Sequence, residues 1–326
     1  MLTAGVDIGG SSVRALARAE NGSIVGRYEG RVAVEGGGQM VSAVAAAFRA
    51  LRMPDCDALG VGVPGQVDPR SGRLAMALNL GLGSQAYDLA GEVESALGIP
   101  VVIENDVRAA ALGAWDALRS TAAPPQSLAL VNIGTGISSG VVVEGRLVRG
   151  SRGMAGEIGH VVIEEGGAQC RCGQRGCLEA VAAGPAIARA WPAGEAGSAA
   201  TALFSAVEAG DPTAAKVARR VAGHITTALI WLAASYDTEV VVLTGGVAGA
   251  SEALLQMIRE EVEHRGASSE LAARRLRPDQ VTLGSTDQLP GAMGAALLAV
   301  DHLLRIEAAA RKASNETRAS KQGGRI

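Results

Sequence analysis

The sequence has few aromatic residues, few cysteines and no long apolar run. Aromatic side chains make up 2% of the 326 residues while hydrophobic residues make up 48%, so the core must consist of Ala, Val, Leu and Ile. Such side chains suit strands packed closely against alanine-rich helices, and the 44 glycines suit tight turns. No stretch reaches the roughly 18–20 uninterrupted apolar residues of a membrane helix. The length allows two domains of ordinary size.

Features that direct a protein to other compartments or partners are also missing. The start MLTAGVDIGG lacks the basic region and the long apolar run of a signal peptide. A net charge of -3 and a pI near 5.9 give no basis for general attraction to nucleic acids. We therefore expect a cytoplasmic protein that interacts with neither membrane nor nucleic acid. Cysteines stay reduced in that compartment, so clustered cysteines there favour a metal site over disulfides.

The order of predicted elements occurs twice along the chain. Residues 2–8, 12–19 and 24–32 have the character of three strands, with Asn21-Gly22 as a tight hairpin turn, and helices alternate with strands after them. A similar order begins again at Ser127 and closes with a helix near 291–304. The repetition predicts a duplicated α/β fold of two domains with a cleft between them.

The domain boundaries follow from this order. We expect a small first domain of residues 1–115 together with a C-terminal helix at 291–305. A larger second domain would span 116–290 and carry an insertion rich in Gly and Cys. Residues 306–326 are polar and have no apolar face, so we expect them to form a disordered tail.

Three predicted strands end in turns of glycine and small residues, DIGGSS at 7–12, NIGTGISSG at 132–140 and LTGGVAG at 243–249. Glycine lets the backbone approach a phosphate, whose oxygens can then accept hydrogen bonds from backbone N–H groups. One such turn is weak evidence because glycine often follows a strand, but three turns at equivalent places favour a nucleotide site. No turn has the G-x-x-x-x-G-K-[ST] pattern or a lysine. Asp7, at the end of a buried strand, suits Mg²⁺ or its waters.

The segment IEND places Asn105 and Asp106 at the carboxyl end of a strand, where a helix begins. Ligands bind at such ends in open α/β sheets. A carboxylate at such a position can orient a bound hydroxyl and take its proton. Asp106 suits this role, although aspartate is also a frequent helix N-cap.

Three of the four cysteines, Cys170, Cys172 and Cys177, lie within eight residues, and His160 lies ten residues upstream. Structural zinc takes four Cys or His ligands in a tetrahedron. The spacing, with glycines between the cysteines, predicts a metal site, and the alternative is three reduced thiols without a ligand. Cys56 is isolated and suits an ordinary partly buried position.

Six segments in this order resemble the ROK family, namely DIGGSSVRA, GVPGQVD, ENDVRAAALG, IGTGISSGVVVEGRLVRG, GMAGEIGH and CRCGQRGCLE. The resemblance covers about residues 4–300. The family contains bacterial sugar kinases and sugar-responsive repressors on the actin-like ATPase (ribonuclease H-like) fold. Its repressors carry a winged helix-turn-helix of about 80 residues before the first glycine turn. Asp7 is the seventh residue here, so we expect this chain to lack that module.

The resemblance implies an ATP-dependent hexose kinase that transfers the γ-phosphate to the 6-hydroxyl of a sugar, with glucose as the default. It implies ATP, Mg²⁺ and a structural Zn²⁺ as cofactors, and a homodimer or homotetramer. One alternative is an N-acetylhexosamine kinase acting on N-acetylglucosamine or N-acetylmannosamine. Another is a non-catalytic sugar sensor or regulator without the DNA-binding module. The sequence does not decide the hexose, nor whether polyphosphate replaces ATP.

The resemblance also assigns residues to roles, with Asp106 as the catalytic base. The sugar would contact Gly65, Asn79, Asn105, Asp106, Glu157, His160 and Glu179. The nucleotide would contact Asp7, Gly9, Gly10, Ser11, Ser12, Gly134, Thr135, Gly136, Gly245 and Gly246. Zinc would be held by His160, Cys170, Cys172 and Cys177, and would fix the loop that carries Glu179. Glu157 and Glu179 would otherwise be solvated surface acids.

Three departures from the family pattern put the substrate and the rate in doubt. Arg108 stands where many family kinases have asparagine. Ser138 and Ser139 stand where glycines are common, and the segment after Asn79 lacks an aromatic residue.

Overall fold

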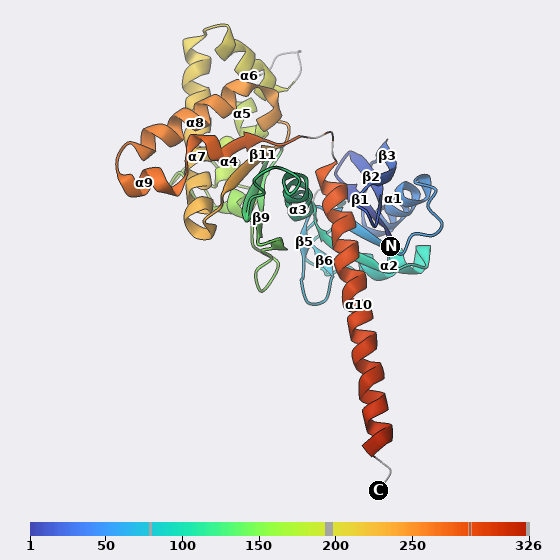
Figure 1. Ribbon diagram of the computed structural model, residues 1–326. Helices are drawn as coiled ribbons and strands as arrows, with labels where there is room; N and C mark the ends of the chain where they lie inside the picture. Colours follow the sequence, from blue (N-terminus) through green and yellow to red (C-terminus); the bar gives the residue numbers. More distant parts are fainter. Residues whose placement is uncertain (78–79, 193–197, 286, 288, 324–326) are drawn as a thin grey trace. The chain divides into compact units, whose positions relative to one another are not determined.

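The computed structural model describes residues 1–77, 80–192, 198–285, 287 and 289–323. The chain divides into two compact units, one formed by Met1–Gly113 with Gly291–Ile326 and the other by Ala114–Pro290. The first unit therefore contains both ends of the chain, blue and red in Figure 1. Among the described residues, no helix combines the length and apolar character needed to cross a membrane.

Each unit contains a five-stranded sheet, and the two sheets have equivalent strand orders, β3-β2-β1-β4-β7 and β10-β9-β8-β11-β12. In both sheets, the strand that comes first in the sequence pairs antiparallel with the second strand and parallel with a later strand. The duplicated α/β fold predicted from the sequence is confirmed by this topology. The strands of the first sheet are β1 Leu2–Ile8, β2 Ser12–Ala19, β3 Ile24–Arg31, β4 Ala58–Val63 and β7 Val101–Asn105. Those of the second are β8 Ser127–Ile133, β9 Ile137–Val143, β10 Arg146–Leu147, β11 Val240–Thr244 and β12 Val281–Leu283.

Helices and a small hairpin complete the first unit. The helices are α1 Gly37–Ala50, α2 Leu89–Leu97, the start of α3 Asp106–Leu118, and α10 Pro290–Gly323, and the hairpin strands are β5 Gln66–Val67 and β6 Leu74–Ala75. Local residues fix the ends of α2, because Asp88 accepts a hydrogen bond from the Gly91 N–H at its start. Gly98, at φ 73°, ends the helix in the left-handed conformation that glycine adopts easily.

Helix α10 packs against the first sheet at positions where that sheet has glycine. A Cβ atom on Gly5 of β1 would overlap the Ala292 carbonyl, and one on Gly60 of β4 would overlap the Ala295 carbonyl. Ala292 and Ala295 are fully buried. The missing side chains let the helix backbone approach the strands closely, so the end of the chain completes the core of the first unit.

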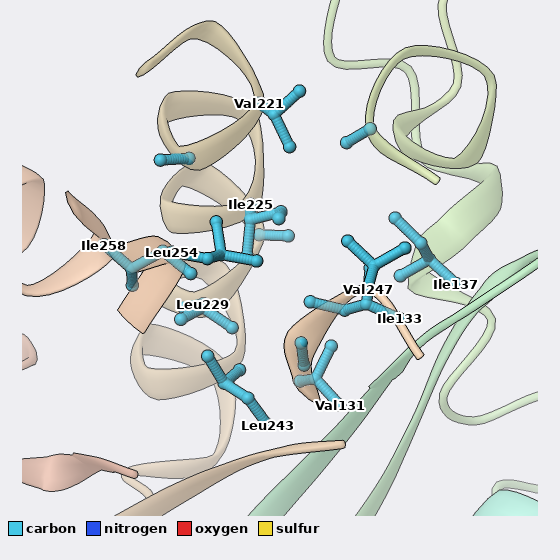
Figure 2. Close-up of a cluster of buried hydrophobic side chains, with 14 of the residues drawn as sticks. Val131, Ile133, Ile137, Val221, Ile225, Leu229, Leu243, Val247, Leu254 and Ile258 are labelled. Carbon is cyan, nitrogen blue, oxygen red and sulfur yellow. The ribbon is translucent and has the colours of Figure 1, made fainter. Parts of the chain in front are cut away.

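The second unit is rich in helices, and its core lies between α7 and the sheet. Its helices are α4 Leu178–Ala182, α5 Gly184–Ala190, α6 Ala199–Glu208, α7 Pro212–Tyr236, α8 Glu252–Gly266 and α9 Glu270–Arg275. Single 3₁₀ turns lie at η2 Ile158–His160, η3 Ala248–Ala250 and η4 Pro278–Gln280. Figure 2 shows Ile225 and Leu229 of α7 facing Ile133 and Leu243 of the sheet. Each such side chain contributes about 1.5–3 kcal/mol to the free energy of unfolding when it is fully buried.

The polar C-terminal segment differs from the sequence prediction. We expected residues 306–326 to be disordered, but α10 continues through this segment to Gly323. Ala, Glu, Lys and Arg are strong helix formers, and the ion pair between Arg311 and Glu307, at i, i+4 spacing and 3.7 Å, adds support. The residues at 304–312 are exposed, which agrees with the absence of an apolar face.

Candidate active site

The junction between β7 and α3 presents Asn105 and Asp106, the last residue of the strand and the first of the helix. Asn105 Oδ1 accepts hydrogen bonds from the N–H groups of Val107 and Arg108, each at 3.1 Å. Asn105 Nδ2 donates to Asp106 Oδ1 at 3.0 Å, and the same oxygen accepts from the Val107 N–H at 2.9 Å. Asn105 therefore takes the larger share of helix capping, the role considered as an alternative for Asp106, and it orients the Asp106 carboxylate.

Arg108, one of the departures from the family pattern, forms a buried ion pair. Its Nε donates to Glu104 Oε1 at 2.7 Å, and the two side chains are only 2% and 3% exposed. The same Glu104 oxygen accepts the Asn105 backbone N–H at 2.9 Å. A buried pair persists only when its charges are well hydrogen-bonded, so this pair fixes the backbone beside the predicted catalytic residue. Sequence reasoning missed Glu104, which belongs to the strand β7 whereas Arg108 belongs to the helix α3.

Gly65 lies in the turn after β4 and contacts this junction. Its φ is +119°, and a Cβ atom there would lie 2.9 Å from the Ala75 carbonyl oxygen, so only glycine fits. The Gly65 carbonyl accepts a hydrogen bond from Asn105 Nδ2 at 3.1 Å. Asn79, the other residue predicted for this part of the sugar site, lies outside the described residues.

Asp7 of β1 lies close to Asp106. Gly62 of β4 separates them, and a Cβ atom on Gly62 would lie 3.5 Å from both Asp7 Oδ1 and Asp106 Cα. Gly291, in the first turn of α10, approaches the Asp7 carboxylate so closely that a Cβ atom would overlap it. Burial, and then the charge of Asp106, raise the pKa of Asp7 to about 7, while Arg14 has a smaller opposite effect. Two neighbouring carboxylates, one of which is costly to ionise, form a site that favours a cation.

The turn between β1 and β2 contains the first group of predicted nucleotide contacts, Gly9, Gly10, Ser11 and Ser12. The Gly9 N–H donates to the Ser12 carbonyl at 2.8 Å, which keeps the turn short. A Cβ atom on Gly10 would meet no atom within 4 Å, and one on Gly9 would make only ordinary contacts, to Ser12 at 3.5 and 3.8 Å. The packing of the chain does not require glycine here, whereas a ligand held against the backbone would.

Two more glycine turns meet at the carboxyl ends of β8 and β11, which are neighbouring inner strands of the second sheet. Gly134, Thr135 and Gly136 follow β8, and the Gly134 N–H donates to the Gly136 carbonyl at 2.9 Å. Gly245 and Gly246 follow β11, and a Cβ atom on Gly245, which has φ +93°, would lie 2.5 Å from the Ile133 carbonyl oxygen. This contact places the two turns side by side. A Cβ atom on Gly134 or Gly246 would again meet nothing within 4 Å, so both turns leave room beside the backbone.

His160, Cys170, Cys172 and Cys177 form a compact group. Their ligand atoms all lie within 4.8 Å of one another. His160 Nδ1 lies 3.6 Å from Cys170 Sγ, and the Cys172 and Cys177 sulfurs are also 3.6 Å apart. Four ligands at tetrahedral positions around zinc, with Zn–S of 2.3 Å, stand about 3.8 Å apart. The four residues therefore fit a structural zinc ion, and the sequence correctly predicted which four side chains meet.

The thiols of Cys172 and Cys177 differ in acidity. Desolvation raises the pKa of Cys172, but hydrogen bonds from the Gln174 backbone and from neighbouring side chains outweigh it and bring the pKa to about 7. Desolvation, followed by hydrogen bonds with Cys172 and Cys170, raises the pKa of Cys177 to about 12. A metal binds thiolates, so Cys172 is better prepared than Cys177 to accept it.

The segment that carries Glu157 and His160 is fixed to β9. The Gly156 carbonyl accepts hydrogen bonds from the Ser139 N–H at 2.8 Å and from the Ser139 hydroxyl at 3.2 Å. Ser139 is 2% exposed, so the serine found at a position where glycine is common serves as a connection to this segment. Glu157 is half-buried, and its carbonyl accepts the His160 N–H at 3.1 Å.

Glu179, in the first turn of α4, connects the cysteine loop with the glycine turn after β8. Its Oε2 accepts the Ile137 N–H at 3.2 Å, and its Oε1 accepts from Arg171 Nη2 at 3.1 Å. The Glu179 side chain is 12% exposed, so it is not a solvated surface acid. A Cβ atom on Gly136 would lie 2.5 Å from Glu179 Oε2, which explains the glycine at that position. Sequence reasoning missed Arg171, although it stands between two of the predicted metal ligands.

The structure brings the predicted residues together within each unit. In the first unit the group is Gly65, Asn105, Asp106, Asp7 and the Gly9–Ser12 turn. In the second unit the group is Glu157, His160, Glu179, the three clustered cysteines and the two turns at 134–136 and 245–246.

A comparison with protein families decides what kind of protein has these features. The ROK family model matches residues 3–302. The chain belongs to the ROK family. Among curated ROK relatives, a glucokinase of Halalkalibacterium halodurans is 33% identical over 283 residues, covering 79% of this chain and 84% of the relative. An N-acetylmannosamine kinase of Vibrio cholerae is 31% identical over 271 residues, covering 81% and 90%.

Solved structures agree with the family assignment. The ROK hexokinase of Thermus thermophilus has a TM-score of 0.78 at 32% identity, covering 94% of this chain and all (100%) of that one. A ROK glucokinase of Streptomyces griseus, solved with glucose and AMPPNP, has a TM-score of 0.73 at 28% identity and covers 92% and 100%. The fold is that of the ROK sugar kinases, the actin-like ATPase fold.

Proposed function

We propose that this ROK protein is an ATP-dependent glucokinase, which transfers the γ-phosphate of ATP to the 6-hydroxyl of glucose. The observation that carries the proposal is the Asp106 carboxylate, which Asn105 Nδ2 holds at 3.0 Å at the carboxyl end of β7. Asp106 would orient the 6-hydroxyl and take its proton as the phosphoryl group leaves ATP. The Halalkalibacterium glucokinase and the Streptomyces complex with glucose and AMPPNP support both the sugar and the nucleotide.

The other site residues receive roles in the same proposal. Asp7 would hold Mg²⁺ or its waters, because a cation relieves the cost of ionising this carboxylate. The glycine turns would hold the nucleotide through backbone N–H groups. Hydroxyls of the sugar would be bound by Gly65, Asn79, Asn105, Glu157, His160 and Glu179.

Zinc would have a structural role in this enzyme. When bound, it would fix the loop of the three clustered cysteines. His160 would use Nδ1, which faces Cys170 at 3.6 Å, for the metal and keep Nε2 for a sugar hydroxyl. The proposal places the enzyme in the cytoplasm, where thiols stay reduced, and in a homodimer or homotetramer. Light scattering that finds only a monomer of 32.9 kDa would contradict that assembly.

An assay of ADP release against a panel of hexoses tests the proposed function. The panel contains glucose, mannose, fructose, allose, N-acetylglucosamine and N-acetylmannosamine. A parallel series replaces ATP with polyphosphate and measures the sugar phosphate formed, because that donor releases no ADP. We expect the highest kcat/KM on glucose. The Vibrio relative favours N-acetylmannosamine as the second candidate, and a higher kcat/KM on that sugar would replace glucose in the proposal. ADP release that no sugar accelerates would indicate a sugar sensor instead.

The role of Asp106 is tested by replacing it with asparagine. Asp106→Asn should lower kcat by about 10²–10⁴ and leave the Kd for glucose nearly unchanged, because it removes the base and keeps the shape. Asp116→Asn on the same helix is the matched control, since Asp116 pairs with Arg119 at 3.2 Å and should tolerate the change. If Asp106→Asn keeps more than about a tenth of the wild-type kcat, the assignment is wrong.

A further inference from the structure

Arg171 lies where the cysteine loop meets a glycine turn. It stands between Cys170 and Cys172, and its Nη2 donates to Glu179 Oε1 at 3.1 Å. A Cβ atom on Gly136 would lie 3.9 Å from the same Nη2. The guanidinium is therefore adjacent to the turn Gly134–Gly136, while 61% of the side chain remains exposed. The exposed part can contact a ligand that occupies the space beside this turn.

The glycine turns themselves supply no cation. DIGGSS, NIGTGISSG and LTGGVAG contain neither lysine nor arginine. Phosphoryl transfer spreads negative charge over the oxygens of the transferred group, and positively charged side chains stabilise that charge. An arginine has a planar fork that matches two phosphate oxygens. Arg171 thus brings from another segment the charge that the turns lack.

We propose that Arg171 binds the terminal phosphate of the bound nucleotide, and that Glu179 holds the guanidinium beside Gly136 until the nucleotide arrives. This inference rests on the proposed function, because it assigns the Gly134–Gly136 turn to nucleotide phosphates. The flanking residues Cys170 and Cys172 belong to the metal group, so a bound metal fixes the backbone of Arg171 on both sides. The cysteine loop then serves the phosphate as well as the sugar.

A purely structural role for Arg171 makes a different prediction. If Arg171 only covers Glu179, its loss should disturb sugar binding and leave nucleotide binding unchanged. If it binds the terminal phosphate, its loss should weaken a nucleotide that has a γ-phosphate and spare one that lacks it. The comparison between a non-hydrolysable ATP analogue and ADP therefore separates the two roles.

The experiment measures the Kd of AMPPNP and of ADP by calorimetry, in the presence of Mg²⁺, for the full-length chain. Arg171→Ala should weaken AMPPNP binding by about 10- to 100-fold, the size of a hydrogen bond to a charged group, and ADP binding by less than about twofold. Arg171→Lys should lie between wild type and Arg171→Ala, because lysine keeps the charge without the fork. Arg175→Ala is the matched control in the same loop, since Arg175 contacts Gln169 at 3.4 Å, and it should behave as wild type.

Zinc content shows whether the loop of each variant is intact, and Arg171→Gln replaces Arg171→Ala if the alanine variant loses metal. Equal weakening of AMPPNP and ADP, or no weakening of either, would overturn the inference. The result is distinguishable from failure of the proposed function. A wild-type protein that phosphorylates no hexose rejects the kinase proposal, whereas an active wild type whose Arg171 variants bind AMPPNP normally rejects only the role of Arg171.

Discussion

Asp7 is a half-buried acid whose charge is disfavoured by its own surroundings. Burial and the nearby Asp106 raise its pKa to about 7, and the first turn of α10 lies against its carboxylate. A helix N-terminus favours negative charge, yet here it does not compensate for burial and the second carboxylate. The arrangement suits an acid whose negative charge is neutralised by a cation that binds together with the substrate.

Replacing Asp7 with asparagine should raise the Tm at pH 8 and leave it nearly unchanged at pH 4, when Mg²⁺ and nucleotide are absent. An acid whose pKa rises from 3.8 to about 7 on folding binds its proton more tightly in the folded state. The folded protein therefore loses stability as the pH rises from about 4 to about 7, and asparagine escapes that loss. Thermal melts over a pH series measure the effect.

Asp301→Asn is the control for this pH series, because Asp301 is 54% exposed on α10. The difference in Tm between Asp301→Asn and wild type should stay constant between pH 4 and pH 8. A Tm difference between wild type and Asp7→Asn that stays constant with pH would contradict the assignment of the raised pKa to Asp7.

The sequence predicted some of these residues better than others. Asp106 and the four metal ligands stand in compact motifs, and the structure brings the four ligand side chains together as predicted. Glu104 and Arg171 were missed because their partners decide their importance. Nothing in the letters IEND shows that Glu104 is 3% exposed, and nothing in CRC shows that Arg171 reaches Glu179. Contacts between distant segments depend on packing, which a local pattern does not contain.

At the scale of elements, the cysteine loop is attached to its surroundings on two sides. Glu179 joins it to the strand β9 through the Ile137 N–H. Glu164 joins it to α7, where Arg220 Nη2 donates to both Glu164 oxygens at 2.7 Å. His224 Nε2 lies 3.7 Å from Glu164, and burial lowers the pKa of His224, so this contact involves a neutral imidazole near pH 7. A loop attached in this way should transmit the loss of its metal to Glu179.

Metal analysis of protein purified without added metal should find about one zinc per chain. Cys172→Ser should lose the zinc and raise the KM for the sugar, because the same loop holds the metal and carries Glu179. Cys56→Ser is the matched control, since Cys56 is a buried thiol of the first unit and bonds to the Ala58 carbonyl at 3.3 Å. Loss of zinc with an unchanged KM would mean that the metal stabilises the loop without shaping the sugar site.

The strands and long helices were predictable because their apolar patterns are strong. The strands predicted at 2–8 and 12–19 are β1 and β2, and the second round of elements begins at Ser127 with β8, as predicted. The short helices α4 and α5 were not predicted individually, because they last only 5 and 7 residues and lie in a Gly- and Ala-rich region. The alanine-rich face of α7 contributes to the core of the second unit, where Ala214, Ala218 and Ala222 are buried.

At the scale of the whole molecule, α10 has two parts with different roles. Its beginning is buried against the first sheet, where Ala292, Ala295 and Ala299 are fully inaccessible. Its continuation at 304–312 is exposed, and Leu304 is 51% exposed. Only the first part therefore contributes to the core of the unit.

Removing residues 308–326 should change the Tm by less than about 2 °C and leave kcat/KM unchanged, because the side chains at 308–312 are exposed. Ending the chain at residue 290 is the contrasting variant, since it removes the buried alanines as well. That variant should fail to form a stable first unit. A large drop in Tm on removing only 308–326 would show that the end of α10 has a partner, such as a second copy of the chain.

The discontinuous make-up of the first unit also sets an order of events during translation. During synthesis β1 emerges first and α10 last, yet the surface at Gly5 and Gly60 is covered by α10. The second unit is one continuous segment, Ala114–Pro290. Its core can therefore form before α10 has been synthesised, while the first sheet is still without this helix. The strands that are synthesised first, β1 among them, thus remain without their covering helix α10 for the longest time. Translation that stops between Pro290 and the end of the buried part of α10 would therefore produce a chain with a complete second unit. Its N-terminal sheet would lack α10 and would be prone to aggregate.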